Sequence, residues 1–302
     1  MEALLRLRCL DAGAFTFVMA TGIVSEAAAE QRLVVLSQAL FAVAAAAWVV
    51  LAAVVLLRAI RGAPRPRPAS FAVVAATAVV GVRSLDVGAT TPALGLWALA
   101  VACWIGLALA RPAVGEPRGS TLLVPVATES LAVLATPLAQ RFGLLLERVA
   151  LAFWLLGLAL YPVVVVAIGR ALRRSRAFRP DLWVVMGCLA IATLAAAQLA
   201  VDGAGRWVRE AAVATWVVAT AWIVPLLVAE LRRADWRYDG ARWAFVFPLG
   251  MYGVACEALA RAEGLAALRR VAVAALAVAL VAWTLTVLGL LRTASVHAGS
   301  KR

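Results

Sequence analysis

The sequence is poor in histidine, in charged residues and in paired cysteines. Its one histidine is His297, and its four cysteines, Cys9, Cys103, Cys188 and Cys256, lie far apart without a Cys-x-x-Cys spacing. Neither a disulfide framework nor a zinc site has the residue spacing that it needs, so we expect no metal and no cofactor. Charged residues make up only 15% of the chain, which is too few for the surface of an ordinary soluble domain.

Apolar residues dominate instead, at 65% of the chain with a mean hydropathy of +0.96. This composition is typical of an integral membrane protein. Ten apolar runs approach the length of about 20 residues that a helix needs to cross a bilayer. We therefore predict an all-α integral membrane protein with one transmembrane domain, residues 1–302, and ten transmembrane helices. The ten runs cover residues 12–30, 33–60, 69–88, 92–110, 119–138, 144–169, 182–201, 210–231, 243–260 and 268–291.

The basic residues are distributed unevenly between the two sides of this topology. Twenty of the 29 fall before the first run (Arg6 and Arg8), in every second loop after it, and in the tail with Lys301 and Arg302. Cytoplasmic loops collect Lys and Arg, so both termini are predicted to be cytoplasmic. The apolar composition, with arginine far outnumbering the single lysine, favours the plasma (inner) membrane. We interpret these arginines as determinants of topology and as contacts for membrane lipid. Because no soluble face carries the net charge of +13, nucleic acid is not an expected partner.

Polar residues separate the ten runs into two alternating sets. The first, third, fifth and seventh runs carry hydroxyl, amide or ionisable side chains, whereas the fourth and sixth are almost purely apolar. Polar groups in the hydrocarbon region are costly unless they face protein or water, so the odd-numbered helices are predicted to lie inside. The chain then forms five helical hairpins in a ring, which favours a pore or a carrier. The candidate residues lining or adjoining the pore are Thr21, Ser25, Arg83, Thr128, Glu129, Ser130, Thr193, Gln198 and Phe245.

The ninth run contains the stretch WAFVFPLGMYGVACE, residues 243–257, with Phe247 and Pro248 in its middle. Pro248 cannot donate a backbone hydrogen bond, so we expect a helix kink there. The carbonyl that it leaves free is tolerated where the helix faces protein or a wet cavity, which makes this helix a candidate pore wall. In the alternative interpretation, Phe245 and Phe247 are ordinary packing aromatics and Pro248 is a passive kink.

Five stretches, FTFVMATGIVS, LLVPVATESLAVLA, LWVVMGCLAIATLAAA, TWVVATAWIVPLL and RWAFVFPLGMYGVA, together resemble the tellurite-resistance/dicarboxylate transporter family. That family includes the plant slow-type anion channels, a bacterial tellurite-resistance channel homologue and fungal malate permeases. The resemblance implies five hairpins in a quasi-fivefold arrangement around a central anion pathway, and a homotrimer. It also implies that Phe247, which matches the phenylalanine of the channel members, occludes the pore.

Two residues call for separate interpretations. Glu129 stands where a neutral glutamine is expected from the family. If it faces the pore, its protonation assists anions and transport increases as the pH falls; alternatively, it lies in a helix interface, bonded to Thr or Ser hydroxyls. Arg83 either contacts anions or forms a structural salt bridge with Asp86, three residues on, and with Glu26 at similar depth.

The predicted function is transport of small anions, such as chloride, nitrate or a C4-dicarboxylate like malate, through a pore gated by Phe247. The sequence leaves open a proton-coupled C4-dicarboxylate carrier in place of a channel. A membrane-embedded lipid-modifying enzyme is the alternative from another class, but the acidic residues are isolated and do not form the cluster that such an enzyme needs. We therefore expect a protein that is not an enzyme.

Overall fold

The computed structural model describes residues 14–60, 66–113, 115–175, 179–232, 238 and 240–299. Arg6, Arg8, Cys9, Lys301 and Arg302 lie outside these ranges, and the side chain of His297 is not described. Within the described ranges the chain forms ten α-helices and no strand, which confirms the predicted all-α fold. Five helices form an inner set: α2 (Phe15–Glu30), α4 (Ala72–Asp86), α6 (Leu123–Phe142), α8 (Val184–Val201) and α10 (Trp243–Glu263). Each is followed by a helix of the outer set: α3 (Val34–Ile60), α5 (Thr90–Leu109), α7 (Leu144–Ser175), α9 (Arg206–Leu231) and α11 (Ala266–Gly299).

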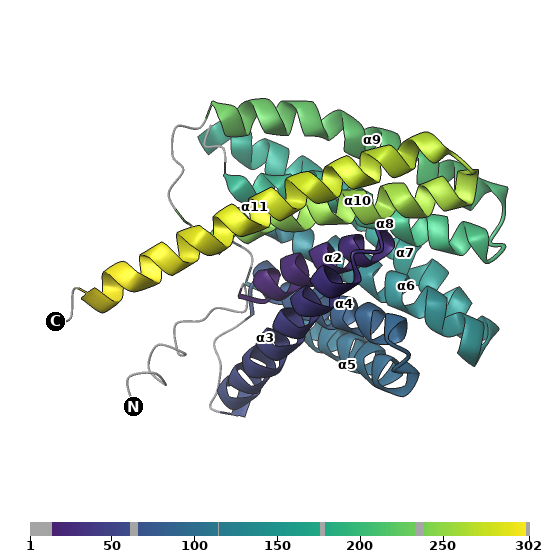
Figure 1. The fold of residues 1–302 in the computed structure, drawn as a ribbon, viewed down its shortest axis with the longest axis horizontal. Helices are drawn as coiled ribbons and strands as arrows, with labels where there is room; N and C mark the ends of the chain where they lie inside the picture. The colour runs from purple at the N-terminus through teal and green to yellow at the C-terminus, as the bar shows by residue number, and fades with distance from the viewer. Residues whose placement is uncertain are drawn as a thin grey trace.

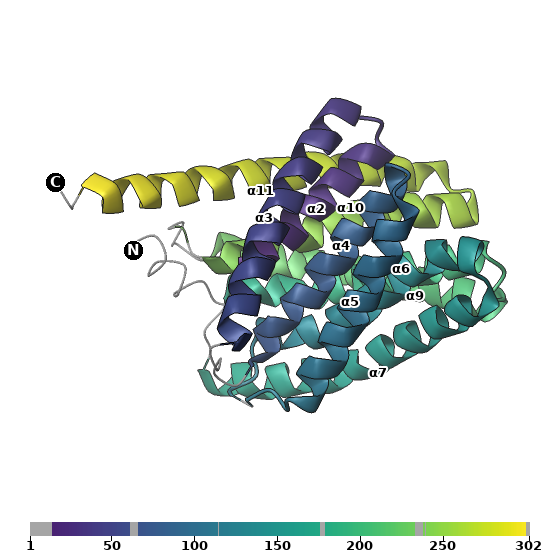
Figure 2. The same cartoon turned by 90° about the horizontal axis from the view of Figure 1, so that it is seen from below.

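The two sets form concentric rings. Between 67% and 94% of the hydrophobic stretch of α4, α6, α8 and α10 is buried within the protein, against 11% to 28% for the outer helices. Most of α2 is buried as well. Each inner helix packs against the outer helix that follows it, and the inner helices contact one another in chain order until α10 returns to α2. Figures 1 and 2 show this bundle, with the end of α11 extending beyond it. The predicted arrangement of five hairpins is therefore confirmed.

The outer ring presents the surface expected of a protein in a bilayer. Large apolar side chains are exposed along every outer helix, among them Val50, Ile105, Val163, Val217 and Val281. Nine of the ten described helices are long and apolar enough to cross a membrane when the 3-10 turns that precede four of them are counted; α2, with 16 residues, is the exception. The apolar outer surface and the buried polar residues of the inner ring fit lipid outside and protein inside.

A tryptophan on each outer helix donates its indole N–H to the next inner helix. Three of the acceptors are threonine hydroxyls, at nitrogen–oxygen distances of 2.9 to 3.0 Å; the others are the carbonyl of Ala192, at 3.0 Å, and the thiol of Cys256, at 3.3 Å. The pairs are Trp48–Thr77, Trp104–Thr128, Trp154–Ala192, Trp216–Cys256 and Trp283–Thr21. Since the last pair joins α11 to α2, these bonds connect the two rings around the whole circumference.

Short 3-10 turns precede four inner helices, at Pro68–Phe71, Gly119–Leu122, Pro180–Trp183 and Gly240–Arg242. They displace the α-helical starts of α4, α6 and α8 by two to four residues from the starts of the apolar runs. At the other end, α7 continues to Ser175 and α11 to Gly299, beyond the predicted ends at 169 and 291. The apolar pattern stops where the hydrocarbon ends, whereas helical backbone hydrogen bonding can continue into water.

Candidate functional site

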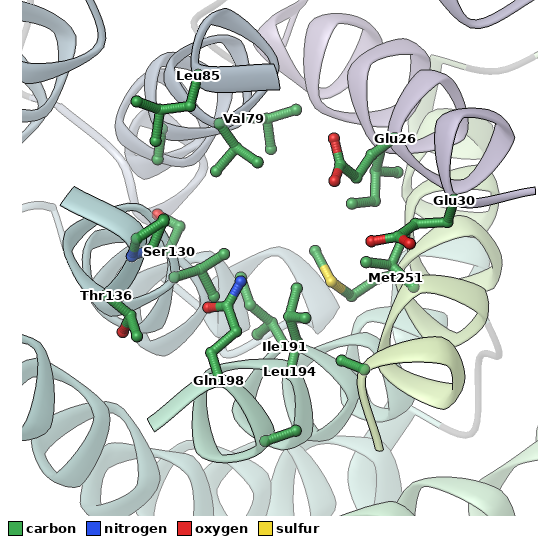
Figure 3. Close-up of a pocket in the computed structure, with 18 of the residues that line it drawn as sticks. Glu26, Glu30, Val79, Leu85, Ser130, Thr136, Ile191, Leu194, Gln198 and Met251 are labelled. Carbon is green, nitrogen blue, oxygen red and sulfur yellow. The ribbon is translucent and has the colours of Figure 1, made fainter. Parts of the chain in front are cut away.

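The inner ring encloses a cavity of about 380 Å³ to which all five inner helices contribute (Figure 3). The first lining residue of each helix lies six to eight positions after the helix begins. These residues, which form the cavity floor, are Ile23, Ala78, Ser130, Ile191 and Met251. The cavity runs from this floor towards the carboxyl-terminal ends of the inner helices, so the five helices run parallel around it.

The cavity floor and walls are mainly apolar, with a few uncharged polar groups on α6 and α8. Ser130 and Thr136 line the α6 side, but each hydroxyl donates to a carbonyl of its own helix, at 2.7 Å and 2.9 Å. Gln198 extends into the cavity from α8, and its Oε1 has no hydrogen-bond partner. Of the residues predicted to line or adjoin a pore, Ser130 and Gln198 line this cavity.

The rim of the cavity is formed by Glu30, Asp86, Gln140, Asp202 and Arg261, the last lining residue of each inner helix. The rim carries three carboxylates and one guanidinium. Arg261 Nη2 donates to Glu30 Oε1 at 2.6 Å, and Gln140 Nε2 donates to Asp202 Oδ1 at 3.0 Å. The sequence analysis did not predict the rim residues Glu30, Gln140, Asp202 and Arg261. Their positions at or just after the ends of odd-numbered runs could have indicated a polar rim there. Glu257 of α10 does not line the cavity and instead contacts Gln31 and Arg269.

Arg83 lies behind the rim and is 3% exposed. Its guanidinium pairs with Asp86 and, at 3.3 Å, with Glu26, which are the two pairs expected from the sequence. Its Nε donates to Ser25 Oγ at 3.1 Å, and its Nη2 donates to Ser37 Oγ at 2.7 Å. Neither Arg83 nor Ser25 lines the cavity; they connect α2, α3 and α4 beside it. Glu26 does line it, and its carboxylate is held by Arg83.

Phe247 lies on α10, on the amino-terminal side of the cavity floor. It precedes Met251 by four residues on α10, so the two side chains share a face of the helix, and Phe247 is 2% exposed. Pro248 lies inside a continuous α10 and packs against α8: a Cβ added at Gly187 would lie 2.8 Å from Pro248 Cγ. On α10, the residues that line the cavity therefore begin one helical turn after Phe247 in the chain. Phe245 lies elsewhere, edge-on to Trp183 with ring centroids 4.7 Å apart.

Three predicted threonines face the outer ring and not the cavity. Thr21 and Thr128 accept the tryptophan hydrogen bonds described above, and Thr193 lies 2.9 Å from the hydroxyl of Thr215 on α9. They tie inner helices to outer ones. Their polarity marked the helices correctly as inner, but their side chains do not line the cavity.

Glu129 is fully buried and points away from the cavity, although it precedes Ser130 directly. Its Cγ lies against Gly157 of α7, where an added Cβ would be 2.3 Å away. The thiol of Cys188 on α8 donates to Oε2 over 3.7 Å, and Oε1 has no hydrogen-bond partner. Glu129 thus lies in the interface of α6, α7 and α8, with a thiol in place of the expected Thr or Ser hydroxyls.

Comparison with known proteins agrees with this geometry. Part of the chain is similar to the uncharacterised membrane proteins Rv1735c and MT1776 of Mycobacterium tuberculosis, strains H37Rv and CDC 1551. Each is 35% identical over 126 residues. The match covers 37% of this chain and 63% of either relative. Over residues 10–291 the sequence matches the SLAC1 family, described as voltage-dependent anion channels. Since that match covers nearly the whole chain, the protein belongs to the SLAC1 family of voltage-dependent anion channels.

Proposed function

We propose that this protein moves small anions across the membrane along the axis of the inner ring, with Phe247 as the gate. The observation that carries the proposal is the cavity built by all five inner helices, whose lining on α10 begins one turn after Phe247 in the chain. An anion that enters from the rim reaches Met251 and Ile191 on the cavity floor. Beyond them, in this proposal, the benzyl group of Phe247 blocks the path. A bulky apolar side chain at a constriction stops ions by narrowing and dewetting the path.

The electrostatics of the inner ring support an anion as the permeating species. Because the five inner helices run parallel, their amino-terminal ends, which are the positive ends of the helix dipoles, gather at one side of the ring. Exposed Arg118 and Arg179 precede two of these ends. We propose that this side faces the cytoplasm and that the acidic rim faces outward, as the distribution of basic residues predicts. Anions are then drawn to the cytoplasmic side, while the rim opposes them from outside.

The proposal is tested by anion flux in proteoliposomes that contain the wild type or Phe247→Ala, with chloride, nitrate and malate compared. We expect a nearly closed wild type and large, non-saturating currents from Phe247→Ala. Phe245→Ala is the matched control, because it removes the same benzyl group from a site packed against Trp183. Equal flux through wild type and Phe247→Ala, with both correctly inserted, contradicts the gate.

A proton-coupled C4-dicarboxylate carrier is the second candidate. It is favoured by one observation, the fully buried Glu129 carboxyl group with one oxygen unpartnered. A carrier predicts saturable malate uptake driven by a pH gradient, and Phe247→Ala then abolishes coupled uptake. The same liposome assay, with malate concentration varied, separates the two.

The assembly and the location are proposed from the family resemblance and the charge pattern: a homotrimer in the plasma membrane with both termini cytoplasmic. The mass of the detergent-solubilised particle, from light scattering, tests the trimer. Cysteine labelling of residues introduced at the rim, compared in intact cells and in inverted vesicles, tests the orientation.

A further inference from the structure

Glu129 and Phe247 are connected by a short series of direct contacts through α8. Glu129 accepts a hydrogen bond from the thiol of Cys188. The residue before Cys188 is Gly187, which packs against the ring of Pro248, and Pro248 directly follows Phe247. The series therefore runs from the interface of α6 and α8 to the backbone that carries the proposed gate.

Gly187 and Pro248 pack too closely for α8 and α10 to move independently at this contact. A Cβ on Gly187 would lie 2.8 Å from Cγ, 3.0 Å from Cβ and 3.2 Å from Cα of Pro248. On its other side, α10 is just as close to α2, because a Cβ on Gly250 would lie 2.9 Å from Ile23 Cγ2. A shift of α8 at Cys188 must therefore move Pro248 or separate α8 from α10.

Around Glu129 the described part of the chain supplies neutral groups and no cationic partner. Its own helix α6 contributes apolar residues and the hydroxyl of Ser130, which donates to Ala127. The titratable groups that face it are Cys188 of α8 and Tyr161 of α7, one helical turn after Gly157. Among the described residues, no Arg, Lys or His pairs with Glu129. An ionised carboxylate in this interface would have one weak thiol donor and no cation. A buried charge without a partner strongly destabilises the packing around it.

We propose that Glu129 is a positioning residue that makes the Phe247 gate responsive to pH, an inference that rests on the proposed function. When Glu129 loses its proton, the charged carboxylate disrupts the packing of α6 against α8. The movement of α8 reaches Pro248 through Gly187 and releases the benzyl group of Phe247. Flux therefore increases as the pH rises. This is opposite to the direction expected from the sequence, because that expectation required Glu129 to face the anion path.

The test is a pH profile of chloride flux in proteoliposomes at about pH 6 and about pH 8.5. These two values span much of the wide range of pKa values that carboxyl groups show at buried sites in proteins. For the wild type we expect about five- to tenfold more flux at the higher pH, the size of a typical allosteric coupling. Glu129→Gln should be flat and low, because the amide cannot ionise. Glu257→Gln is the matched control: it is also buried on an inner helix, but it binds Gln31 and Arg269, and it should keep the wild-type profile.

The double variant Glu129→Gln/Phe247→Ala separates action through the gate from direct repulsion of anions. If Glu129 acts through Phe247, both Phe247→Ala and the double variant conduct strongly and equally at both pH values. If Phe247→Ala keeps a pH dependence that Glu129→Gln removes, Glu129 acts on the anion itself and the inference is wrong. If Phe247→Ala opens but Glu129→Gln keeps the wild-type pH profile, the inference alone is overturned. If Phe247→Ala does not open at either pH, the proposed gate fails.

Gly157→Ala provides a second route to the same contact, should Glu129→Gln fail to insert. Its methyl group would lie 2.3 Å from Glu129 Cγ, so it displaces the carboxyl group while keeping its chemistry. We expect higher flux at about pH 6 than in the wild type. The ratio of flux at about pH 8.5 to flux at about pH 6 should fall by about twofold or more, which lies within the usual range of coupling changes. An unchanged profile in a correctly inserted Gly157→Ala protein contradicts the inference.

Discussion

Arg261 of α10 and Glu30 of α2 form a hydrogen-bonded ion pair at 2.6 Å, although 231 residues separate them in the chain. The pair joins the last inner helix to the first and so closes the rim of the cavity. It also neutralises one of the three rim carboxylates. Asp86 is likewise paired with Arg83, so the rim carboxylate without a cationic partner is Asp202, which accepts only from the neutral amide of Gln140.

Removing a rim carboxylate should ease the passage of anions from this side. For Asp202→Asn we expect about a two- to threefold increase in flux at low ionic strength, since a like charge at a mouth lowers the local anion concentration. The increase should disappear at about 1 M salt, where charges are screened over about 3 Å. Glu210→Gln, an exposed carboxylate on α9 paired with Arg206, is the control and should leave flux unchanged. An increase that does not depend on salt would argue against an electrostatic origin.

Arg83 should matter far more for stability than for conduction. Arg83 is almost fully buried and holds Glu26, Asp86, Ser25 and Ser37, so Arg83→Ala breaks these bonds and leaves Glu26, whose side chain is only 12% exposed, without its cation. We expect a loss of about 3 kcal/mol or more in the free energy of unfolding, as for other broken buried ion pairs. Thermal unfolding in detergent, followed by tryptophan fluorescence, measures it. Arg261→Ala is the contrast: its side chain is 48% exposed, so the loss should stay below about 1 kcal/mol.

The architecture of the protein could be predicted from the sequence because lipid imposes a simple rule on each helix. Outer helices must be apolar and inner helices can hold polar groups, so counting polar residues in each run separates the two rings. The same rule does not say which face of an inner helix lines the cavity. Helices buried on nearly every side have no amphipathic pattern to read, so Thr21 and Thr128 could not be distinguished from Ser130.

Two further features depend on partners that are distant in the chain. Glu129 and Ser130 are adjacent, but successive residues on a helix point about 100° apart, so one faces α7 and the other the cavity. The acceptors of the five tryptophans include a backbone carbonyl and a thiol, which no pattern of residue types would connect. The proposed role of Phe247 came from family resemblance, and it stays a prediction.

The tryptophan hydrogen bonds between the rings should each contribute modestly to stability. Trp283→Phe keeps most of the apolar surface but removes the N–H that bonds to Thr21 over 3.0 Å. We expect a loss of about 1 kcal/mol in the free energy of unfolding, the usual net value of one hydrogen bond. Trp207→Phe, at an indole that is 49% exposed, is the matched control and should change stability less. Equal losses from both variants would show that ring size and not the hydrogen bond is responsible.

Gly187→Ala should open the pathway without any change in charge. Its methyl group would lie 2.8 Å from Pro248 Cγ, and both atoms belong to stiff parts of their helices, so α8 and α10 must separate slightly. We expect a several-fold rise in anion flux, within the range of about 5- to 150-fold seen for allosteric coupling. Gly169→Ala on α7 is the control, because its Cβ would meet nothing within 4 Å. That substitution should leave flux unchanged and slightly favour the helix, since alanine is the better helix former. If Gly187→Ala stays as closed as the wild type while retaining its fold, the contact between α8 and α10 does not hold Phe247 in place.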